Sequence, residues 1–163
     1  MIDGTRSTKT DNNSATYPID VKWSPHGDKC FVLDETYNRM LQYTATIPFV
    51  IDRQNTTYDG ASIDVSLSGS EPKGFDFSPD GTLLFVIFSA SAADRIICYQ
   101  LANPYDVTTT FAELGGAGNN REDVGPIDIY PRGILVRETS AGVSIFWHGN
   151  ENDDIYRQDL LGF

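Results

Sequence analysis

A stretch of 15 residues in this chain occurs twice, at an offset of 54 residues and without a gap. Residues 18–32 and 72–86 share six identical positions, and their apolar positions coincide. A looser third copy is offset from the second by 61 residues, which places Phe146 on Phe85. A period near 50 residues is typical of proteins built from repeated strand-rich units. The repeat therefore constrains the fold more strongly than the activity.

Each of the first two copies begins with a strand pattern. Ile19, Val21 and Trp23 alternate with polar residues, and Phe75 and Phe77 do the same in the second copy. A period of two residues indicates a strand with one buried face. We therefore expect the copies to begin with equivalent strands, and the phenylalanines of the following apolar runs, Phe31, Phe85 and Phe146, to occupy equivalent buried positions.

A Ser-Pro-x-Gly turn follows the first strand of both copies. Proline fixes φ at the second turn position, and glycine accepts the positive φ that closes a hairpin. The expected structural turn residues are Pro25, Gly27, Pro79 and Gly81. The first copy differs at one turn position, where it has a histidine in place of the aspartate of the second copy.

The rest of each repeat also reads as strands. The turns lead into continuous apolar runs, which are typical of strands covered on both faces. Third strands are expected at residues 40–43, 96–101 and 155–160, and fourth strands at 61–67 and 110–114. No segment sustains the period of 3.6 residues of a helix. The sequence therefore predicts an all-β, β-propeller-like fold with about three four-stranded antiparallel blades per chain.

The expected organisation is a polar N-terminal arm over residues 1–16 and a single propeller-like domain over 17–163. Its repeats span approximately 17–70, 71–120 and 121–163, and the third lacks a fourth strand. Propellers typically close with four to eight blades, so three blades would leave open sheet edges. We therefore expect a homo-oligomer that completes the propeller, most simply as a two-fold ring of six blades.

The composition excludes some partners. The 163 residues carry a formal net charge of -11, which argues against binding to nucleic acid or to anionic membrane surfaces. No apolar run approaches the roughly 20 residues of a membrane span, and the first residues lack the apolar core of a signal peptide. The localisation is left open. Cys30 and Cys98 lie in apolar strand segments and are expected to be buried free thiols.

Acidic residues collect in the loops that precede the third strands. Glu151, Asp153 and Asp154 lie together, and residues 34–35 and Asp94 lie in the matching loops. Calcium prefers carboxylate and amide oxygens, so the first three are the candidate metal ligands and calcium the candidate ion. Their spacing matches no established calcium motif, and a solvated hairpin turn is the alternative interpretation.

The sequence contains no recognisable catalytic motif. His26 and His148 lack the spacing of paired metal ligands, and there is no nucleophile elbow or phosphate-binding loop. The glycine-rich segment 115–120 reads as a connector between repeats. No catalytic residue and no organic cofactor site is therefore predicted.

Three elements of the repeat carry a resemblance. They are F-x-F-S-P-D-G-T-x-x-F-V at residues 75–86, I-x-x-Y-x-L at 96–101 and P-Y-D-V-T-T at 104–109. In these elements the chain resembles β-propeller repeats found in tandem in uncharacterised proteins of marine bacteria and their phages. The resemblance covers residues 17–114 well and 133–160 weakly. Because WD40-like, YncE-like and lactonase-like propellers share the Ser-Pro-Asp-Gly element, it indicates the fold and not the activity.

The resemblance implies a non-enzymatic structural or binding module, in particular a phage virion component such as a tail, fibre or capsid-decorating protein. Its partners would be other virion proteins or a surface glycan. The first alternative is a lactonase- or hydrolase-like propeller enzyme with a metal in the central channel. Asp20 and Asp76 are the channel candidates, although the 54-residue offset does not align them. The second alternative is a carbohydrate-binding lectin that uses the loop residues Tyr37 and Tyr58.

Overall fold

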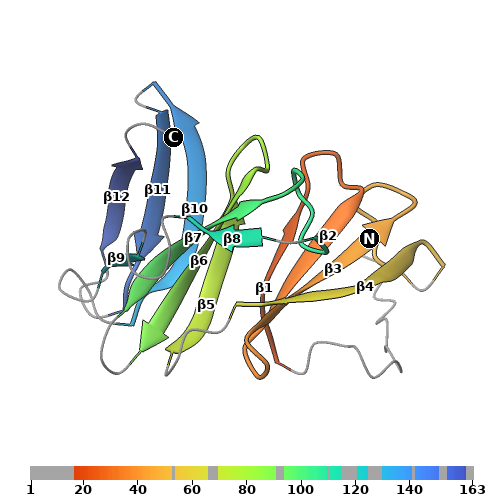
Figure 1. Cartoon of the computed structure of the whole chain (residues 1–163), viewed down its shortest axis with the longest axis horizontal. Coiled ribbons are helices and arrows are strands. Elements are labelled where there is room, and N and C mark those ends of the chain that lie inside the picture. Colours follow the sequence, from red (N-terminus) through yellow and green to blue (C-terminus); the bar gives the residue numbers. More distant parts are fainter. Residues whose placement is uncertain are drawn as a thin grey trace, which may run out of the picture.

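The structure, a computed structural model, confirms an all-β fold. It describes residues 17–52, 54–65, 70–90, 94–109, 111–114, 121–124, 130–140, 142–150 and 154–160. Within these ranges the regular structure consists of strands, without a helix. Figure 1 shows three twisted antiparallel sheets side by side, each of which we call a blade. The expected N-terminal arm, residues 1–16, lies outside the described residues.

Blade 1 is a four-stranded antiparallel meander in chain order. Its strands are β1 (Pro18–Trp23), β2 (Lys29–Asp34), β3 (Arg39–Ala45) and β4 (Thr56–Asp64). The outermost strand begins earlier than the sequence pattern indicates, because Thr56 already pairs with Ala45 at the end of β3.

Blade 2 has the same order but divides its outer position between two strands. It comprises β5 (Ser70–Phe77), β6 (Leu83–Ala90), β7 (Arg95–Leu101), β8 (Phe111–Glu113) and β9 (Arg121–Asp123). β8 pairs with the C-terminal half of β7, and β9 pairs with its N-terminal half. The second sheet therefore extends to Asp123.

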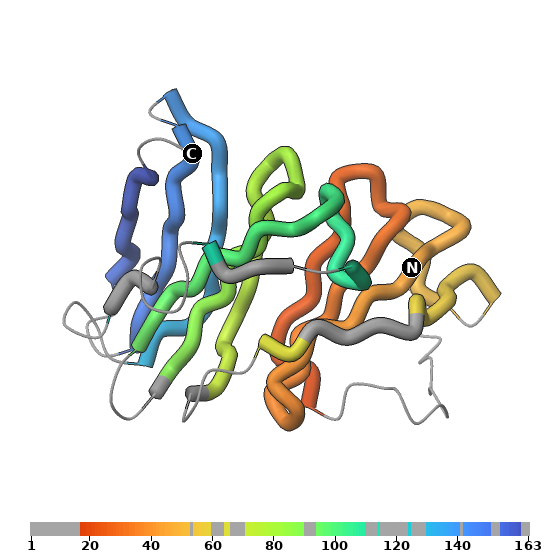
Figure 2. The backbone as a smooth tube through the Cα atoms, in the orientation of Figure 1, coloured from red at the N-terminus to blue at the C-terminus, as the bar shows by residue number. Residues whose placement is uncertain are grey.

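Blade 3 has three strands among the described residues. They are β10 (Arg132–Thr139), β11 (Gly142–His148) and β12 (Ile155–Leu160), in the order β10-β11-β12. The first strands of the three blades lie next to each other, because β1 contacts β5 and β5 contacts β10. We call these three strands the inner strands. The tube in Figure 2 follows this succession from one blade to the next.

Two apolar cores hold the blades together. The first lies between blades 1 and 2 and contains Phe31 and Phe75, and the second lies between blades 2 and 3 and contains Phe85 and Trp147. Phe31 and Phe85 are buried as expected, whereas Phe146 is only half-buried. Because side chains alternate along β11, Trp147 faces blade 2 while Phe146 faces away from it. The Arg157 guanidinium lies 5.8 Å from the Phe146 ring centroid.

The Ser-Pro-x-Gly turns have the predicted geometry. Gly27 has φ of 71° and Gly81 has φ of 74°. An aromatic residue from the loop after the third strand packs on each glycine, Phe49 on Gly27 and Tyr105 on Gly81. The backbone N–H of each aromatic residue donates to the carbonyl of its glycine at 2.9 Å. The phenol of Tyr105 also donates to the carbonyl of Pro79 at 2.7 Å.

An aspartate stabilises both turns, although the sequences differ. In the second copy, the Ser78 hydroxyl donates to Asp80 Oδ1 at 2.6 Å. In the first copy, where His26 replaces this aspartate, the Ser24 hydroxyl donates to Asp28 Oδ1 at the same distance. These hydrogen bonds are the main cause that lowers the pKa of both carboxyl groups. The first copy therefore tolerates the histidine because Asp28, two residues further along the turn, supplies the carboxylate.

Candidate functional site

The inner strands bring charged side chains from all three blades to one wall. Lys22 lies on β1, Asp76 on β5 and Arg137 on β10. Asp76 is central to this group, because the charges of both cations act on its carboxylate. We call these three residues the inner-wall triad.

Asp20 and Asp76 bridge neighbouring blades in the same way. Asp20 Oδ1 accepts a hydrogen bond from the N–H of Val21 at 2.8 Å, and its Oδ2 accepts one from Phe75 in the next blade at 3.1 Å. Asp76 Oδ1 accepts from Phe77 at 3.0 Å, and its Oδ2 accepts from Val136 in the next blade at 2.9 Å. Each aspartate therefore satisfies an N–H on the free edge of an inner strand.

Residue-by-residue alignment hides this equivalence. Asp20 lies three positions before the end of β1, whereas Asp76 lies one position before the end of β5. Each inner strand also contains a register shift near its start, at Ile19, Lys73 and Gly133. The sequence does place a carboxylate on the inner strand of two successive blades, which was a usable signal. It was discounted because the two residues do not align position by position.

Asp76 has an unusual electrostatic environment. Its side chain is 13% exposed, and Arg137 Nη1 lies 3.6 Å from its Oδ2. Burial raises the pKa of the Asp76 carboxyl, because the two N–H donors and the charges of Lys22 and Arg137 compensate only part of the lost hydration. A desolvated carboxyl group that experiences the charge of nearby cations is a frequent feature of functional sites.

The inner strands approach each other closely where their register shifts. A Cβ added to Gly74 would lie 3.4 Å from the Cα of Gly133 and 3.6 Å from Asp20 Oδ2. A Cβ on Gly133 would in turn lie 2.8 Å from Nε2 of His148. The His148 ring therefore lies against the bulge of β10, although the residue is exposed, and His26 is an exposed turn residue.

The acidic loop residues that are described make structural contacts. Asp34 is fully buried, and its Oδ1 accepts hydrogen bonds from the N–H groups of Tyr17 and Thr36. Asp94 Oδ2 accepts one from the N–H of Tyr130 at 3.1 Å. Glu35 pairs with Lys73 of blade 2, which links the first two blades at this end of the inner wall.

The candidate calcium ligands fall mostly outside the described residues. Glu151 and Asp153 are not described, and Asp154 is exposed. Among the residues that the structure describes, no group of three His, Cys, Asp or Glu side chains gathers as a metal site would require. Calcium at this loop therefore stays a prediction.

The aromatic residues proposed for a lectin do not form a pair. Tyr37 is exposed in a loop, with the guanidinium of Arg39 4.8 Å from its ring centroid. Tyr58 lies within β4 and not in a loop, and its ring centroid is 5.4 Å from that of Tyr43 in β3. Cys30 and Cys98 are buried free thiols, as expected.

The fold and the inner wall define a propeller-like array of blades. No family model matches the chain, and no curated protein sequence matches it. Solved structures do resemble it. A protein assigned as a 6-phosphogluconolactonase from Bacteroides uniformis aligns with a TM-score of 0.51 and 16% identity, over 86% of this chain and 38% of that one. The periplasmic gluconolactonase PpgL of Pseudomonas aeruginosa aligns with a TM-score of 0.53 and 11% identity, over 90% and 41%.

These similarities correct the main functional hypothesis from the sequence. The phage virion module, whether tail, fibre or capsid-decorating protein, was the wrong interpretation, because the chain's structural neighbours are gluconolactonase propellers. The Ser-Pro-Asp-Gly turn misled the functional interpretation because it defines a blade and not what the blade does. This chain spans about two fifths of the length of these neighbours. Among the described residues, no helix is long and apolar enough to cross a membrane.

Proposed function

We propose that this chain contributes three blades to a lactonase-type propeller and that the inner-wall triad acts on a sugar-acid lactone. The observation that carries the proposal is Asp76, a desolvated inner-strand carboxyl group whose Oδ2 lies 3.6 Å from Arg137 Nη1 and which also experiences the charge of Lys22. The substrate class is taken from the structural neighbours, whose names refer to lactones of gluconate and 6-phosphogluconate. The fold alone does not specify this activity, so the proposal depends on the triad.

The triad offers the groups that lactone hydrolysis needs. Water attacks the lactone carbonyl carbon, a new C–O bond forms, and the ring C–O bond breaks. Asp76 would accept the proton from the attacking water and return it to the departing ring oxygen, so its carboxyl ends the cycle unchanged. The raised pKa of Asp76 suits this role, because a carboxylate with a higher pKa is a stronger general base than one with an ordinary pKa.

The two cations would stabilise negative charge, both on the substrate and in the transition state. Lys22 and Arg137 can attract the oxyanion that develops during attack, and they can hold the carboxylate or phosphate of the sugar acid. Arg137 is more than half exposed and can therefore reorient toward a ligand. Because the chain carries a net charge of -11, an anionic sugar acid would need local cations such as these two to bind.

A divalent metal does not fit the described donors of the inner wall. Asp20 and Asp76 each direct both carboxylate oxygens at backbone N–H groups, and they point into different blade junctions. No third carboxylate or imidazole joins either of them within the part of the chain that is described. No step of the proposed reaction is therefore assigned to a metal.

The test compares two matched aspartate substitutions. Hydrolysis of glucono-δ-lactone and of 6-phosphogluconolactone is followed in a pH-stat for the native chain, Asp76→Asn and Asp20→Asn. Both variants weaken an equivalent blade-to-blade bridge, but only Asp76 belongs to the triad. We expect Asp76→Asn to lower kcat about 100-fold and Asp20→Asn to leave it nearly unchanged.

The matched design separates chemistry from folding. Thermal melts report how far each substitution destabilises the blades. An equal loss of activity in the two variants would mean that Asp76 acts only as a bridge. A native chain that does not exceed the spontaneous rate of lactone opening would contradict the proposed reaction.

We also propose that the chain works as a two-fold assembly of six blades. The support is the exposed apolar surface on the two terminal blades, where Val21 of blade 1 is 53% exposed and Leu135 of blade 3 is 38% exposed. At the internal junctions, inner-strand residues on such faces are covered by the neighbouring blade. Sedimentation at micromolar concentration should give a dimer, and a sharp monomer of 18.0 kDa would contradict it.

A further inference from the structure

The first two inner strands carry their carboxylates at different positions of the repeat. The pairing of β1 with β2 and of β5 with β6 makes Asp20 equivalent to Gly74. Two residues later, on the same face of the strand, Lys22 is equivalent to Asp76. Blade 1 therefore has an aspartate followed by a lysine where blade 2 has a glycine followed by an aspartate.

Gly74 lies where the three inner strands meet. A Cβ placed on it would be 3.6 Å from Asp20 Oδ2 of blade 1 and 3.4 Å from the Cα of Gly133 of blade 3. Glycine inside a strand often marks the close approach of another backbone. A Cβ alone would make ordinary van der Waals contact there, whereas further side-chain atoms would have to push Asp20 or Gly133 aside. This crowding explains why the bridging carboxylate of blade 2 stands at position 76 and not at position 74.

The backbone that Gly74 touches belongs to a packed strand. Gly133 forms the register shift of β10, and the residues of β10 that face blade 2, Ile134 and Val136, are buried in the core between blades 2 and 3. Val136 and Arg137, which contact Asp76, lie on the same strand. A side chain that pushes on Gly133 would therefore act on the strand that holds the partners of Asp76.

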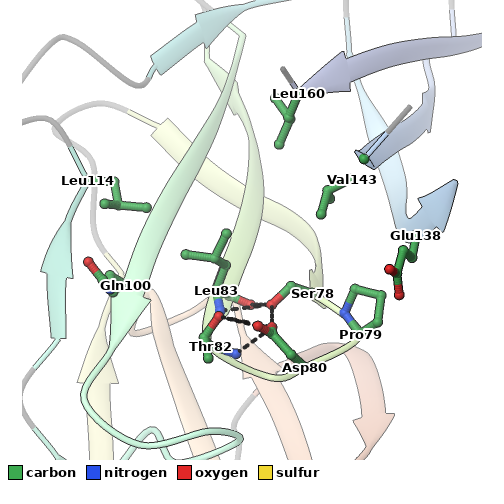
Figure 3. Close-up of a pocket in the computed structure, with 11 residues that line it drawn as sticks. Ser78, Pro79, Asp80, Thr82, Leu83, Gln100, Leu114, Glu138, Val143 and Leu160 are labelled. Carbon is green, nitrogen blue, oxygen red and sulfur yellow. Dashed lines mark hydrogen bonds between the residues drawn. The ribbon is translucent and has the colours of Figure 1, made fainter. Parts of the chain in front are cut away.

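The junction between blades 2 and 3 is wider at its hairpin end. Among the described residues, a cleft of about 440 Å³ lies there between the hairpin of residues 78–83 and Glu138 and Val143 of blade 3 (Figure 3). Asp76 lies on β5 between the Gly74 contact and this cleft. The separation of β5 and β10 at Asp76 is thus set from the side of Gly74, two residues away.

We propose that Gly74 is a positioning residue of the inner-wall triad, because its contact with Gly133 sets the distance of Asp76 from Val136 and Arg137. This role rests on the proposed function, in which Asp76 is the general base. Asp76 Oδ2 lies 2.9 Å from the N of Val136 and 3.6 Å from Arg137 Nη1, and moving β10 outward lengthens both contacts. A misplacement of about 1 Å in an active site can cost about 100-fold in rate.

The charged and titratable groups that act on Asp76 or respond to it come from three elements. Lys22 lies on β1, Arg137 lies on β10, and Tyr105, in the segment after β7, experiences the charge of Asp76. Burial raises the pKa of the Asp76 carboxyl, whereas the N–H of Val136 and the charge of Arg137 lower it. A larger side chain at position 74 weakens these two contacts, so we expect the pKa of Asp76 to rise.

The test is a graded series at position 74. Gly74→Ala adds the Cβ alone, Gly74→Ser adds one atom beyond it and Gly74→Val adds two. NMR of the whole chain, labelled with 13C at the aspartate carboxyl carbons, follows the titration of Asp76, whose signal is assigned by its loss in Asp76→Asn. We expect the pKa of Asp76 to rise along the series. The kcat for glucono-δ-lactone should fall less than about twofold in Gly74→Ala and about tenfold in Gly74→Val.

Asp20→Asn is the matched control, because it changes the other neighbour of Gly74 and keeps the contact with Gly133. It should leave the pKa of Asp76 unchanged. Thermal melts establish that each variant is folded, and Gly74→Ser decides the matter if Gly74→Val is not. An Asp76 pKa that is unchanged or lower in the folded variants, or that rises equally in Asp20→Asn, would overturn the proposal.

The two measurements separate the positioning role from the proposed reaction. A native chain that does not hydrolyse lactones, but whose Asp76 pKa rises along the series, would retain the positioning role and lose the reaction. A native chain that hydrolyses lactones, and in which Gly74→Val changes neither the pKa of Asp76 nor kcat, would retain the reaction and lose the positioning role.

Discussion

Asp76 of β5 accepts a hydrogen bond from the backbone N–H of Val136 in β10 at 2.9 Å, and this bond joins two blades that share no strand pairing. Inner strands pair on one side only, so their other edge presents unsatisfied N–H groups. A side-chain carboxylate from the preceding blade meets one of these groups without adding a strand. Asp20 performs the same role toward Phe75. The register of the blades is thus fixed by polar bridges as well as by the apolar cores.

The bridge between blades 1 and 2 should contribute measurably to stability. Asp20→Ala removes the acceptor and leaves the N–H of the buried Phe75 without this partner, so we expect the free energy of unfolding to fall by roughly 1–3 kcal/mol. Asp20→Asn keeps one acceptor oxygen and should recover part of the loss. Urea denaturation of the three proteins measures the effect. Equal stability of the alanine variant and the native chain would contradict a bridging role.

The contact between Gly81 and Tyr105 should make that glycine irreplaceable. Gly81→Ala forces a Cβ into the ring of Tyr105 and also strains a residue with φ of 74°, so we expect a loss of roughly 1–3 kcal/mol. In the Tyr105→Ala background the steric part disappears, and about 1 kcal/mol for the backbone should remain. Thermal melts of the double-mutant cycle test this expectation. Strict additivity of the two substitutions would mean that the ring and the glycine do not interact.

Much of the fold could be predicted because the signals are local. Alternating residues such as Phe75 and Phe77 require a half-buried strand, and Ser-Pro-x-Gly requires a turn whose glycine has positive φ. The position of β4 and the presence of β9 were missed. Their pairing depends on which edge of β3 or β7 is free, and the sequence of a largely polar strand does not contain that information.

A fall in pH should weaken the stabilisation that Asp80 gives its hairpin, and it should favour the protonated Asp76 of the inner wall. The Ser78 hydroxyl holds the pKa of Asp80 below its ordinary value of 3.8, so the stability that this carboxylate contributes is present above that value and is lost as the pH falls through the lowered pKa. Asp80→Ala should therefore cost about 1 kcal/mol at pH 7 and much less near pH 2. Urea denaturation at the two pH values measures the difference, and a cost independent of pH would contradict the assignment.

The stability that Asp76 contributes should depend on pH in the opposite direction. Burial raises the pKa of its carboxyl above 3.8, so the folded state binds this proton more tightly than the unfolded state does, and the contribution of Asp76 to stability declines as the pH rises through the raised pKa. Asp76→Asn, which is always neutral, should therefore gain stability relative to the native chain between pH 3 and pH 7. The same denaturation series supplies the comparison. A relative loss over this range would mean that the cations outweigh burial.

The candidate site was only partly accessible from the sequence. Asp20 and Asp76 were recognised as channel candidates, but Lys22 and Arg137 were not, because a lone cation on a strand resembles any solvated residue. Their significance comes from the contact of three inner strands that are far apart in the sequence. The two aspartates also lie two aligned positions apart on β1 and β5, so a residue-by-residue comparison of the repeats does not pair them.

The buried thiols provide a probe of the core between blades 2 and 3 and of the interior of blade 1. Cys98 lies in the core between blades 2 and 3, where burial raises the pKa of its thiol to about 12, and Cys30 is 1% exposed. Because the thiolate is the reactive species, neither cysteine should react with a disulfide reagent such as dithionitrobenzoate at pH 8 while the blades are intact. In denaturing urea both should react within minutes. Reaction of Cys98 in the native protein, at a rate that does not follow global unfolding, would mean that blades 2 and 3 separate on their own.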